Sequence, residues 1–544
     1  MKVLRKTEIF YLILLIAVVG YANFCTDSFT FEPVYFQYPD AGEQYVYHNL
    51  FDSTLLADDP FTILILEHIN NITLTRVFIR LKIYLFLMLF FPLSFVLKLA
   101  SMILCVFSVI LIFKTVRYLY SKSFSYVTSG VFLIYFLSMD TFYGGQDRSF
   151  GAFIFLIFMF FLVKEKFMYL PFVLTVISFF YPQILFLVTI ICLLVPFFYN
   201  RKIKIKWYLL ILIINLAISI LFLLVDRENS IVLENLSLLR SYKYVVDIAN
   251  TVNMHNPIDI LRYFILNFNE HSRLYIIFTN FFIIASLFIV FFRKAASLRM
   301  PKAIWLMLLG SILGFIMVYP VNSVLASRQF MFTLPLFLVF FVTINISSII
   351  ERFKIKSFLL LMPIVLIFVV LHPFYNNANL NYKKYKPLYD YIDHLPKSVV
   401  IAGFPNSQFI ESIPLFSKRQ IFHADGMDDI SIMTYGGTGF KTRRKDLILA
   451  LYASSLKKIK DFVCQYSIDY FVIEDYMYKD GVINSYKRPS FPRMEEGYSI
   501  IANDISKNYF LSGFIKENYN FKQEIDRGAV YIVDTRRLLG NSDE

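Results

Sequence analysis

The sequence predicts a mainly α, polytopic helical membrane protein of about 11 transmembrane helices, followed by a C-terminal extracytoplasmic α/β domain. Three observations favour this fold class. Hydrophobic residues make up 57% of the 544-residue chain, a share that soluble domains rarely reach. Apolar runs near the roughly 20 residues that cross a bilayer recur along most of the chain. In the C-terminal tail, by contrast, the charges nearly balance, as is usual for a soluble domain.

Eleven apolar runs are the expected spans, and the charges between them give an independent check of their order. With the N-terminus in the cytoplasm, the inner connections hold nineteen Lys and Arg residues against only Glu165 and Glu351. This surplus exceeds the net charge of +13 of the whole chain, so the basic composition needs no nucleic-acid partner. The expected spans are residues 8–24, 97–114, 124–139, 149–163, 167–181, 183–199, 207–225, 274–292, 303–319, 329–348 and 357–373.

Two hydrophobic stretches near the N-terminus need a separate interpretation. Residues 1–22 have the basic start and apolar middle of a signal peptide, but the match to a cleavage site is weak, so we interpret them as a retained span. Lys82 to Leu97 is apolar enough to be a further span, but such a crossing would invert every later loop against the charge rule. We therefore expect about 62–95 to lie on the outer surface as amphipathic or membrane-grazing helices.

The domain organisation follows from this topology. Residues 1–375 are expected to form the transmembrane domain, with outer loops 25–96 and 226–273, and residues 376–544 the extracytoplasmic domain. The N-terminus then faces the cytoplasm.

The tail shows the order strand, helix, strand, which predicts a small α/β domain. Ser398 to Ala402 reads as a buried strand ending in Gly403, and two further strands are expected at 470–473 and 529–533. Lys445 to Tyr466 has the apolar spacing of a helix.

The first outer loop opens with an acidic and aromatic patch, residues 38–45. If the patch is helical, Asp40 and Glu43 share one face. One carboxylate could then act as a general base, while the other orients it or binds a metal. The alternative is that both are solvated loop carboxylates or helix caps. The flanking aromatic residue Tyr45 favours a functional patch, and Asp40 is the strongest candidate for the base.

Three further groups are candidates for substrate binding. Asp59, in Asp58-Asp59-Pro60, could contact substrate, but we favour a helix N-cap with Pro at the first helical position. Asp147 and Arg148 lie at an expected membrane boundary, where the guanidinium could hold a lipid phosphate or an Asp–Arg pair could fix the turn. Arg328, at the outer end of another span, is a second candidate for binding a phosphate, and the alternative is that it snorkels to the interface.

The tail offers weaker candidates. The loop Gly403 to Asn406 follows a strand, and loops at the carboxyl ends of strands often line binding sites. His423 with Asp425 and the pair Arg443-Arg444 are also considered. No P-loop, HExxH or dinucleotide fingerprint occurs, so soluble nucleotide chemistry is unsupported. The four cysteines show no metal or redox spacing, and unpaired thiols are expected, although Cys25 and Cys464 share the outer side.

This layout resembles the GT-C superfamily of membrane glycosyltransferases, in which a first span, a large outer loop opening with an acidic residue and many further spans precede an extracytoplasmic domain. The segment Asp40-Ala41-Gly42-Glu43-Gln44-Tyr45 is similar to that of bacterial members, as are Leu55 to Pro60 and Gly144-Gly145 with Asp147-Arg148. Many members carry an adjacent acidic pair at the catalytic position. Here Ala41 follows Asp40, which leaves the role of a metal or second carboxylate open.

The resemblance implies a polyprenyl-phosphate-linked sugar donor and an acceptor glycan, lipid or protein on the outer side of the membrane. Asp40 would deprotonate the acceptor hydroxyl, and Arg148 and Arg328 would steady the donor phosphate. No cofactor is certain, and a divalent metal is left open. The alternatives are a transporter or flippase of a lipid-linked envelope precursor and a non-catalytic envelope assembly protein. Few ionisable residues inside the spans and no internal repeat argue against transport.

Overall fold

A computed structural model of the chain describes residues 84–138, 147–228, 300–318, 385–424, 438–478 and 509–540, with short gaps, and parts of 9–17, 35–37, 48–63, 332–344 and 379–381. The chain divides into two compact units. The first, which we call the helical unit, comprises Met1–Gln37, Leu97–Val225 and Val252–Leu380. The second, the α/β unit, comprises Tyr38–Val96, Asp226–Thr251 and Asn381–Glu544.

Helices coincide with seven of the expected spans, to within a few residues at each end. They are α6 (Leu93–Leu119), α7 (Lys122–Ser138), α8 (Asp147–Val163), α9 (Leu170–Phe180), α10 (Leu185–Phe198), α11 (Ile205–Glu228) and α16 (Lys302–Val318). Over Phe95–Leu119, α6 is long and apolar enough to cross a membrane by itself, and the other described apolar helices are shorter. The total of eleven spans stays a prediction.

The junctions between these helices alternate in charge. Lysines and arginines lie where α6 meets α7, where α8 meets α9 and where α10 meets α11, as at Lys122, Lys164 and Lys204. The sequence contains no Lys or Arg between α7 and α8 or between α9 and α10, and Arg148 in the first turn of α8 is the one cation beside these two junctions. Because consecutive spans alternate in direction, this pattern is the one that the positive-inside rule predicts.

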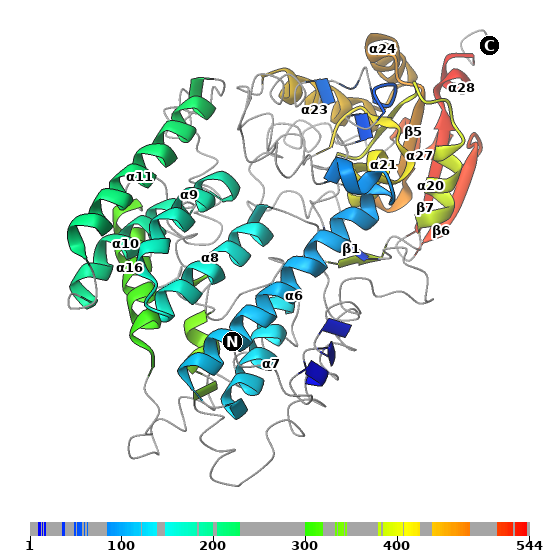
Figure 1. Cartoon of the computed structure of the whole chain (residues 1–544). Helices are drawn as coiled ribbons and strands as arrows, with labels where there is room; N and C mark the ends of the chain where they lie inside the picture. The colour runs from blue at the N-terminus through cyan, green and yellow to red at the C-terminus, as the bar shows by residue number, and fades with distance from the viewer. Residues whose placement is uncertain are drawn as a thin grey trace. The chain divides into compact units, whose positions relative to one another are not determined.

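Polar groups inside the helical unit are bonded to nearby carbonyls, and the helices pack closely. The hydroxyls of Thr128 and Ser129 donate to the carbonyls of Phe124 and Ser125 one turn earlier. The α10 and α16 helices lie side by side (Figure 1), and a Cβ added at Gly310 would lie 2.5 Å from Ile191. Glycine therefore permits this close approach.

Two strands that are far apart in sequence pair with each other. β1 (Tyr35–Gln37) follows the first expected span, and β2 (Asn379–Asn381) follows the last. Together they form a two-stranded sheet. The start of the first expected outer loop and the start of the tail are therefore held together, while the side of the membrane on which they lie stays a prediction.

The α/β unit contains a five-stranded sheet in the order β4-β3-β5-β7-β6. The first three of these are parallel, and β7 and β6 are antiparallel to their neighbours. β3, β5 and β7 lie where strands were predicted, and β4 and β6 were not predicted. The strands are β3 (Val400–Gly403), β4 (Gln420–Ile421), β5 (Tyr470–Glu474), β6 (Phe521–Ile525) and β7 (Gly528–Asp534).

The predicted helix from Lys445 to Tyr466 is wrong as a single element. It is two helices, α23 (Thr438–Leu451) and α24 (Leu456–Tyr466), separated by a short connection. The helix is interrupted at Ser455, whose backbone is extended. Ser455 is the N-cap residue of α24. Serine favours this position because its side chain competes with helical hydrogen bonding.

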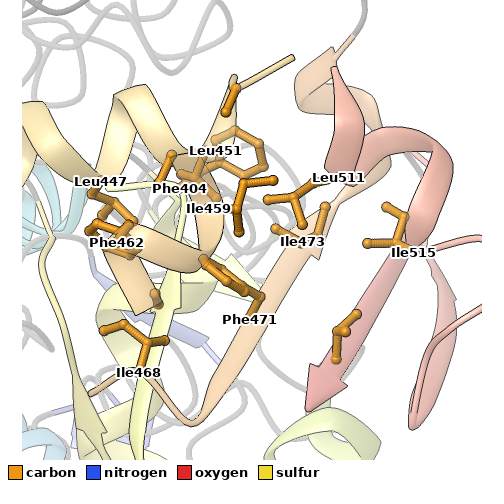
Figure 2. Close-up of a cluster of buried hydrophobic side chains, with 14 of the residues drawn as sticks. Phe404, Leu447, Leu451, Ile459, Phe462, Ile468, Phe471, Ile473, Leu511 and Ile515 are labelled. Atoms are coloured by element: carbon orange, nitrogen blue, oxygen red, sulfur yellow. The ribbon is translucent and has the colours of Figure 1, made fainter. Parts of the chain in front are cut away.

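A large hydrophobic cluster of the α/β unit lies on one face of its sheet (Figure 2). Phe471 and Ile473 of β5 pack there against Leu447 and Leu451 of α23 and Phe462 of α24. The other helices of this unit are α20 (Lys386–Asp393), α21 (Gln408–Ser417), α27 (Phe510–Phe514) and α28 (Thr535–Gly540).

The helix α21 packs on the face of β3 that carries Gly403. A Cβ added there would meet the side chain of Ile410 and the Val472 carbonyl, so glycine allows the helix to approach the sheet.

Candidate functional site

The part of the first outer loop that follows the acidic patch belongs to the α/β unit and packs there against the tail. His48 is buried, and its Nε2 lies 2.9 Å from the carbonyl oxygen of Leu415 at the end of α21. Because a carbonyl only accepts, Nε2–H is the donor. Lys397 and Asp52 form an exposed ion pair at 3.8 Å. These contacts tie the loop to the tail in one compartment.

Burial also decides the charge of His48. Removal from water lowers the pKa of His48 to about 4, with a smaller lowering from Lys418, while the hydrogen bond to Leu415 opposes both. The imidazole is therefore neutral at ordinary pH in the docked state. It acts as a hydrogen-bonding anchor for the loop.

Asp59 has the geometry of a helix cap. Its Oδ2 accepts a hydrogen bond of 2.7 Å from the backbone N–H of Thr62, and the side chain is almost completely buried. This is the favoured alternative for the Asp58-Asp59-Pro60 segment. The cap is the role that the structure gives Asp59, and its part in substrate binding stays a prediction.

The remaining predicted site residues are not tested by the described part of the chain. Asp40, Glu43, Tyr45 and Arg328 lie outside the described residues. α8 begins at Asp147, so Asp147 and Arg148 occupy its first turn, but their side chains also lie outside the description. Their convergence on one site is thus a prediction.

The carboxyl edge of the parallel strands in the α/β unit is closed by aromatic packing. Phe404, directly after β3, is buried and packs edge-on against Tyr452 and Tyr478. The Tyr478 hydroxyl donates to the Leu451 carbonyl, and burial raises the pKa of Tyr478. The predicted binding loop after β3 is therefore filled by side chains where it is described, up to Pro405.

The weaker candidates of the tail are largely structural. Arg443 stacks on the Phe422 ring and donates to the Phe422 carbonyl at 3.0 Å, and His423 and Arg444 are buried. Asp425 lies outside the described residues. Cys464 is a free, exposed thiol, which agrees with the expectation of unpaired cysteines.

No metal centre is found in the described part of the chain. There, no group of three or more His, Cys, Asp or Glu side chains is arranged to hold an ion. The carboxylates of Asp40 and Glu43 are outside that part, so the expectation of a divalent metal stays open.

Sequence reasoning missed one residue, Lys98. It lies in the second turn of α6, within an expected span, and its side chain is 0% exposed. A hydropathy value averaged over an apolar window does not reveal a single lysine. The signal that could have found it is a cation one turn inside the start of a span.

Comparison with known proteins gives a likeness in structure but none in sequence. No protein-family model and no curated protein matches the chain. The oligosaccharyltransferase AglB from Archaeoglobus fulgidus, solved with an inhibitory peptide and a dolichol-phosphate, is similar with a TM-score of 0.51 and 9% identity, over 97% of this chain and 74% of that chain.

Two further solved structures are less similar. The oligosaccharyltransferase of Archaeoglobus fulgidus in complex with Zn and sulfate has a TM-score of 0.48 and 10% identity, over 96% of this chain and 73% of that chain. ArnT from Cupriavidus metallidurans, bound to undecaprenyl phosphate, has a TM-score of 0.39 and 9% identity, over 96% of this chain and 97% of that chain.

The likeness to AglB spans both the helical unit and the α/β unit, because it covers nearly the whole chain. At 9% identity the likeness concerns the path of the backbone and not the residues of a site. The chain therefore shares its overall fold with the oligosaccharyltransferase AglB.

Proposed function

We propose that the protein transfers a sugar from a polyprenyl-phosphate-linked donor to an acceptor on the outer face of the membrane. The observation that carries this proposal is the likeness in fold to AglB, an oligosaccharyltransferase solved with a dolichol-phosphate and an inhibitory peptide. Such an architecture suits a reaction in which a lipid phosphate and an acceptor meet on one side of the membrane.

In this proposal Asp40 is the general base. Its carboxylate takes the proton of the acceptor hydroxyl, and the hydroxyl oxygen attacks the anomeric carbon of the sugar. The bond between that carbon and the phosphate oxygen breaks, and the polyprenyl phosphate leaves with the electron pair. The anomeric configuration is inverted, because attack comes from the side opposite the leaving group.

The other predicted residues act around this step. Glu43 orients the carboxylate of Asp40, and Tyr45 and Asp147 contact the sugar and its carrier. Arg148 and Arg328 balance the negative charge that grows on the phosphate as the bond breaks. All of these belong to expected outer segments.

Sidedness supports the proposal. β1 ends at Gln37, three residues before Asp40, and it pairs with β2 at the start of the tail. His48, eight residues after Asp40, is anchored on α21 of the tail. The segments on both sides of the acidic patch are therefore each hydrogen-bonded to residues of the tail, which supports a common side for the patch and the tail.

The proposal is tested by replacing the base in the full chain. Membranes containing the Asp40→Asn variant are assayed for transfer from a panel of synthetic polyprenyl-phosphate sugars. We expect a loss of about 10²–10⁴-fold for a missing general base. The matched control is Asp52→Asn, an exposed carboxylate of the same loop, which should retain activity. Full activity of a stably inserted Asp40→Asn variant would remove the proposed base.

A further inference from the structure

The helices α6 and α8 contact each other at two levels along their length. The ring centre of Phe107 on α6 lies 6.2 Å from that of Phe153 on α8. Nearer the basic ends of both helices, the Nζ of Lys164 lies 5.6 Å from the centre of the Tyr118 ring. The two contacts are separated by the same number of residues in each helix, so α6 and α8 run parallel and in step. At 1.5 Å per residue, the seam between these contacts is about 16 Å long.

Each helix contributes residues of a single face to this seam, because they follow one another at helical spacing. These residues are exposed on α6 and half-buried on α8. Exposed apolar side chains on a membrane helix meet lipid tails. The seam is about as long as one leaflet of the hydrocarbon core, which is roughly 30 Å thick in total. Its members are Phe107, Lys114 and Tyr118 on α6 and Phe153, Phe160 and Lys164 on α8 and at its end.

Two lysines border the basic end of the seam. The Nζ of Lys164 lies 4.4 Å from the centre of the Phe160 ring, so its ammonium group is placed over rings from both helices. The backbone N–H of Lys164 donates to the Phe160 carbonyl at 3.0 Å and continues the last turn of α8. Lys114 is exposed and lies one turn before Tyr118 on α6. Lys114 and Lys164 therefore lie at the same end of the seam, beside the Tyr118 ring.

The charge rule accounts for lysines at this end of the helices, but not for their arrangement. It requires only that cations lie on one side of the membrane, whereas here an ammonium group is held over two rings at the end of an apolar seam. In the sequence of the two helix ends, Glu165 is the one acidic residue, against the cations of Lys114, Arg117, Lys164 and Lys166. Because helix C-termini carry a partial negative charge, these side chains and not the backbone would hold an anion.

We propose that the seam binds an anionic glycerophospholipid of the surrounding bilayer. One acyl chain lies along Phe107 and Phe153, and the phosphate contacts the ammonium groups of Lys114 and Lys164 and the Tyr118 hydroxyl. Basic sites between membrane helices on the cytoplasmic side bind anionic headgroups in this way. The inference is independent of the proposed function, because the topology assigns this end of α6 and α8 to the cytoplasmic side, opposite the expected outer loops.

The test measures binding of phosphatidylglycerol and of phosphatidylcholine with the same acyl chains to the full chain in detergent, by native mass spectrometry. We expect the wild-type protein to prefer phosphatidylglycerol by at least about tenfold, since each lysine near an anionic headgroup contributes about fivefold. Lys114→Met and Lys164→Met should each reduce the preference by about fivefold, and Lys164→Arg should retain it. The matched control is Lys206→Met, which removes an exposed lysine of α11 outside the seam and should bind as the wild type does.

Two results of this measurement would overturn the assignment. One is equal binding of the two phospholipids to the wild-type protein, or an unchanged preference in both monodisperse methionine variants. The other is a loss in Lys206→Met as large as that in Lys164→Met, because a general attraction of the basic side for anions would then explain the preference without a site at the seam.

A second measurement uses only the wild-type protein, in case a variant does not fold. Phosphatidylglycerol carrying a diazirine in one acyl chain is photolysed with the full chain, and the labelled peptides are mapped. We expect the label in the C-terminal halves of α6 and α8, and its displacement by excess phosphatidylglycerol but not by phosphatidylcholine. A label confined to other helices would contradict the proposal. So would displacement by a polyprenyl monophosphate at a lower concentration than by phosphatidylglycerol, because the site would then select a different class of lipid.

Discussion

The two units differ in how far they expose aromatic rings, as Phe197 in α10 and Phe471 in β5 show. Phe197 is 81% exposed, and Phe471 is 0% exposed within the core of the α/β unit. In the helical unit several large apolar side chains are exposed, and buried hydroxyls are bonded to carbonyls one turn away. Among the described residues of the tail, Tyr519 is the one exposed large apolar side chain.

This difference in exposure indicates which solvent surrounds each unit. Water drives apolar side chains inward, as in the α/β unit. Lipid tails are themselves apolar, so a ring on the outer surface of a membrane helix loses nothing there. The exposed apolar side chains of the helical unit are therefore what a surrounding lipid phase predicts, and their scarcity in the tail is what water predicts.

The largest expected effect concerns truncation of the two rings. Phe471→Ala should destabilise the α/β unit by about 3–5 kcal/mol, because it removes a buried ring and leaves a cavity. Phe197→Ala should change stability little, since lipid replaces the lost contacts. Hydrogen exchange of the β5 and α10 amides in the full chain measures both. Equal losses at the two positions would contradict the assignment of two solvents.

A charge on the outer surface of a membrane helix is the next most costly change. Ile213 lies in the middle of α11 and is 64% exposed. Ile213→Asp should cost about 2.5–3.5 kcal/mol of insertion free energy. Lys458→Asp on the exposed face of α24 is the control and should be nearly neutral. Integration is followed by resistance to alkaline extraction, and a fully integrated Ile213→Asp variant would show that this face of α11 meets water.

Acid should release the loop that His48 anchors. The pKa of His48 is lowered to about 4 in the docked state, so the released state binds the proton more readily. Docking is therefore fully stabilised above the ordinary pKa of about 6.5 and weakens as the pH falls toward 4, by about 3 kcal/mol at most. Hydrogen exchange of residues 48–56 against pH measures this loss. His48→Gln, whose amide can still donate to Leu415, should remove the pH dependence.

The smallest effect concerns the cap at Asp59. Asp59→Ala should destabilise the turn that begins there by about 0.5–2 kcal/mol, because the N–H of Thr62 loses its acceptor. Asp59→Asn should recover most of this loss. The readout is hydrogen exchange at residues 62 and 63. If Asp59→Asn instead abolishes sugar transfer while the exchange is unchanged, Asp59 binds substrate as well.

The sequence predicted the parts of the fold that depend on local pattern. β3, β5 and β7 were predictable as buried Val- and Ile-rich runs, whereas β4 has only two residues and β6 alternates with Lys522 and Glu524. The break at Ser455 was missed because apolar spacing persists through it. Seven of the expected spans coincide with described helices to within a few residues, since hydropathy alone indicates such apolar runs.

Less of the candidate site could be predicted. The cap at Asp59 has a local signature, and it was the favoured alternative. The contact of His48 with Leu415 joins residues 367 positions apart, and no local pattern indicates such a pair. Lys98 was missed because its burial depends on neighbours that the chain brings together only on folding.

The pairing of β1 with β2 has a consequence for biosynthesis. More than three hundred residues separate the two strands, so the ribosome needs tens of seconds to deliver the second after the first. During that interval the edge of β1 has no partner strand of its own, and the acidic patch beside it cannot be held in its final place. The two-stranded sheet can therefore form only after residue 381 has been synthesised, so the first strand waits for almost the whole helical part of the chain before it is paired.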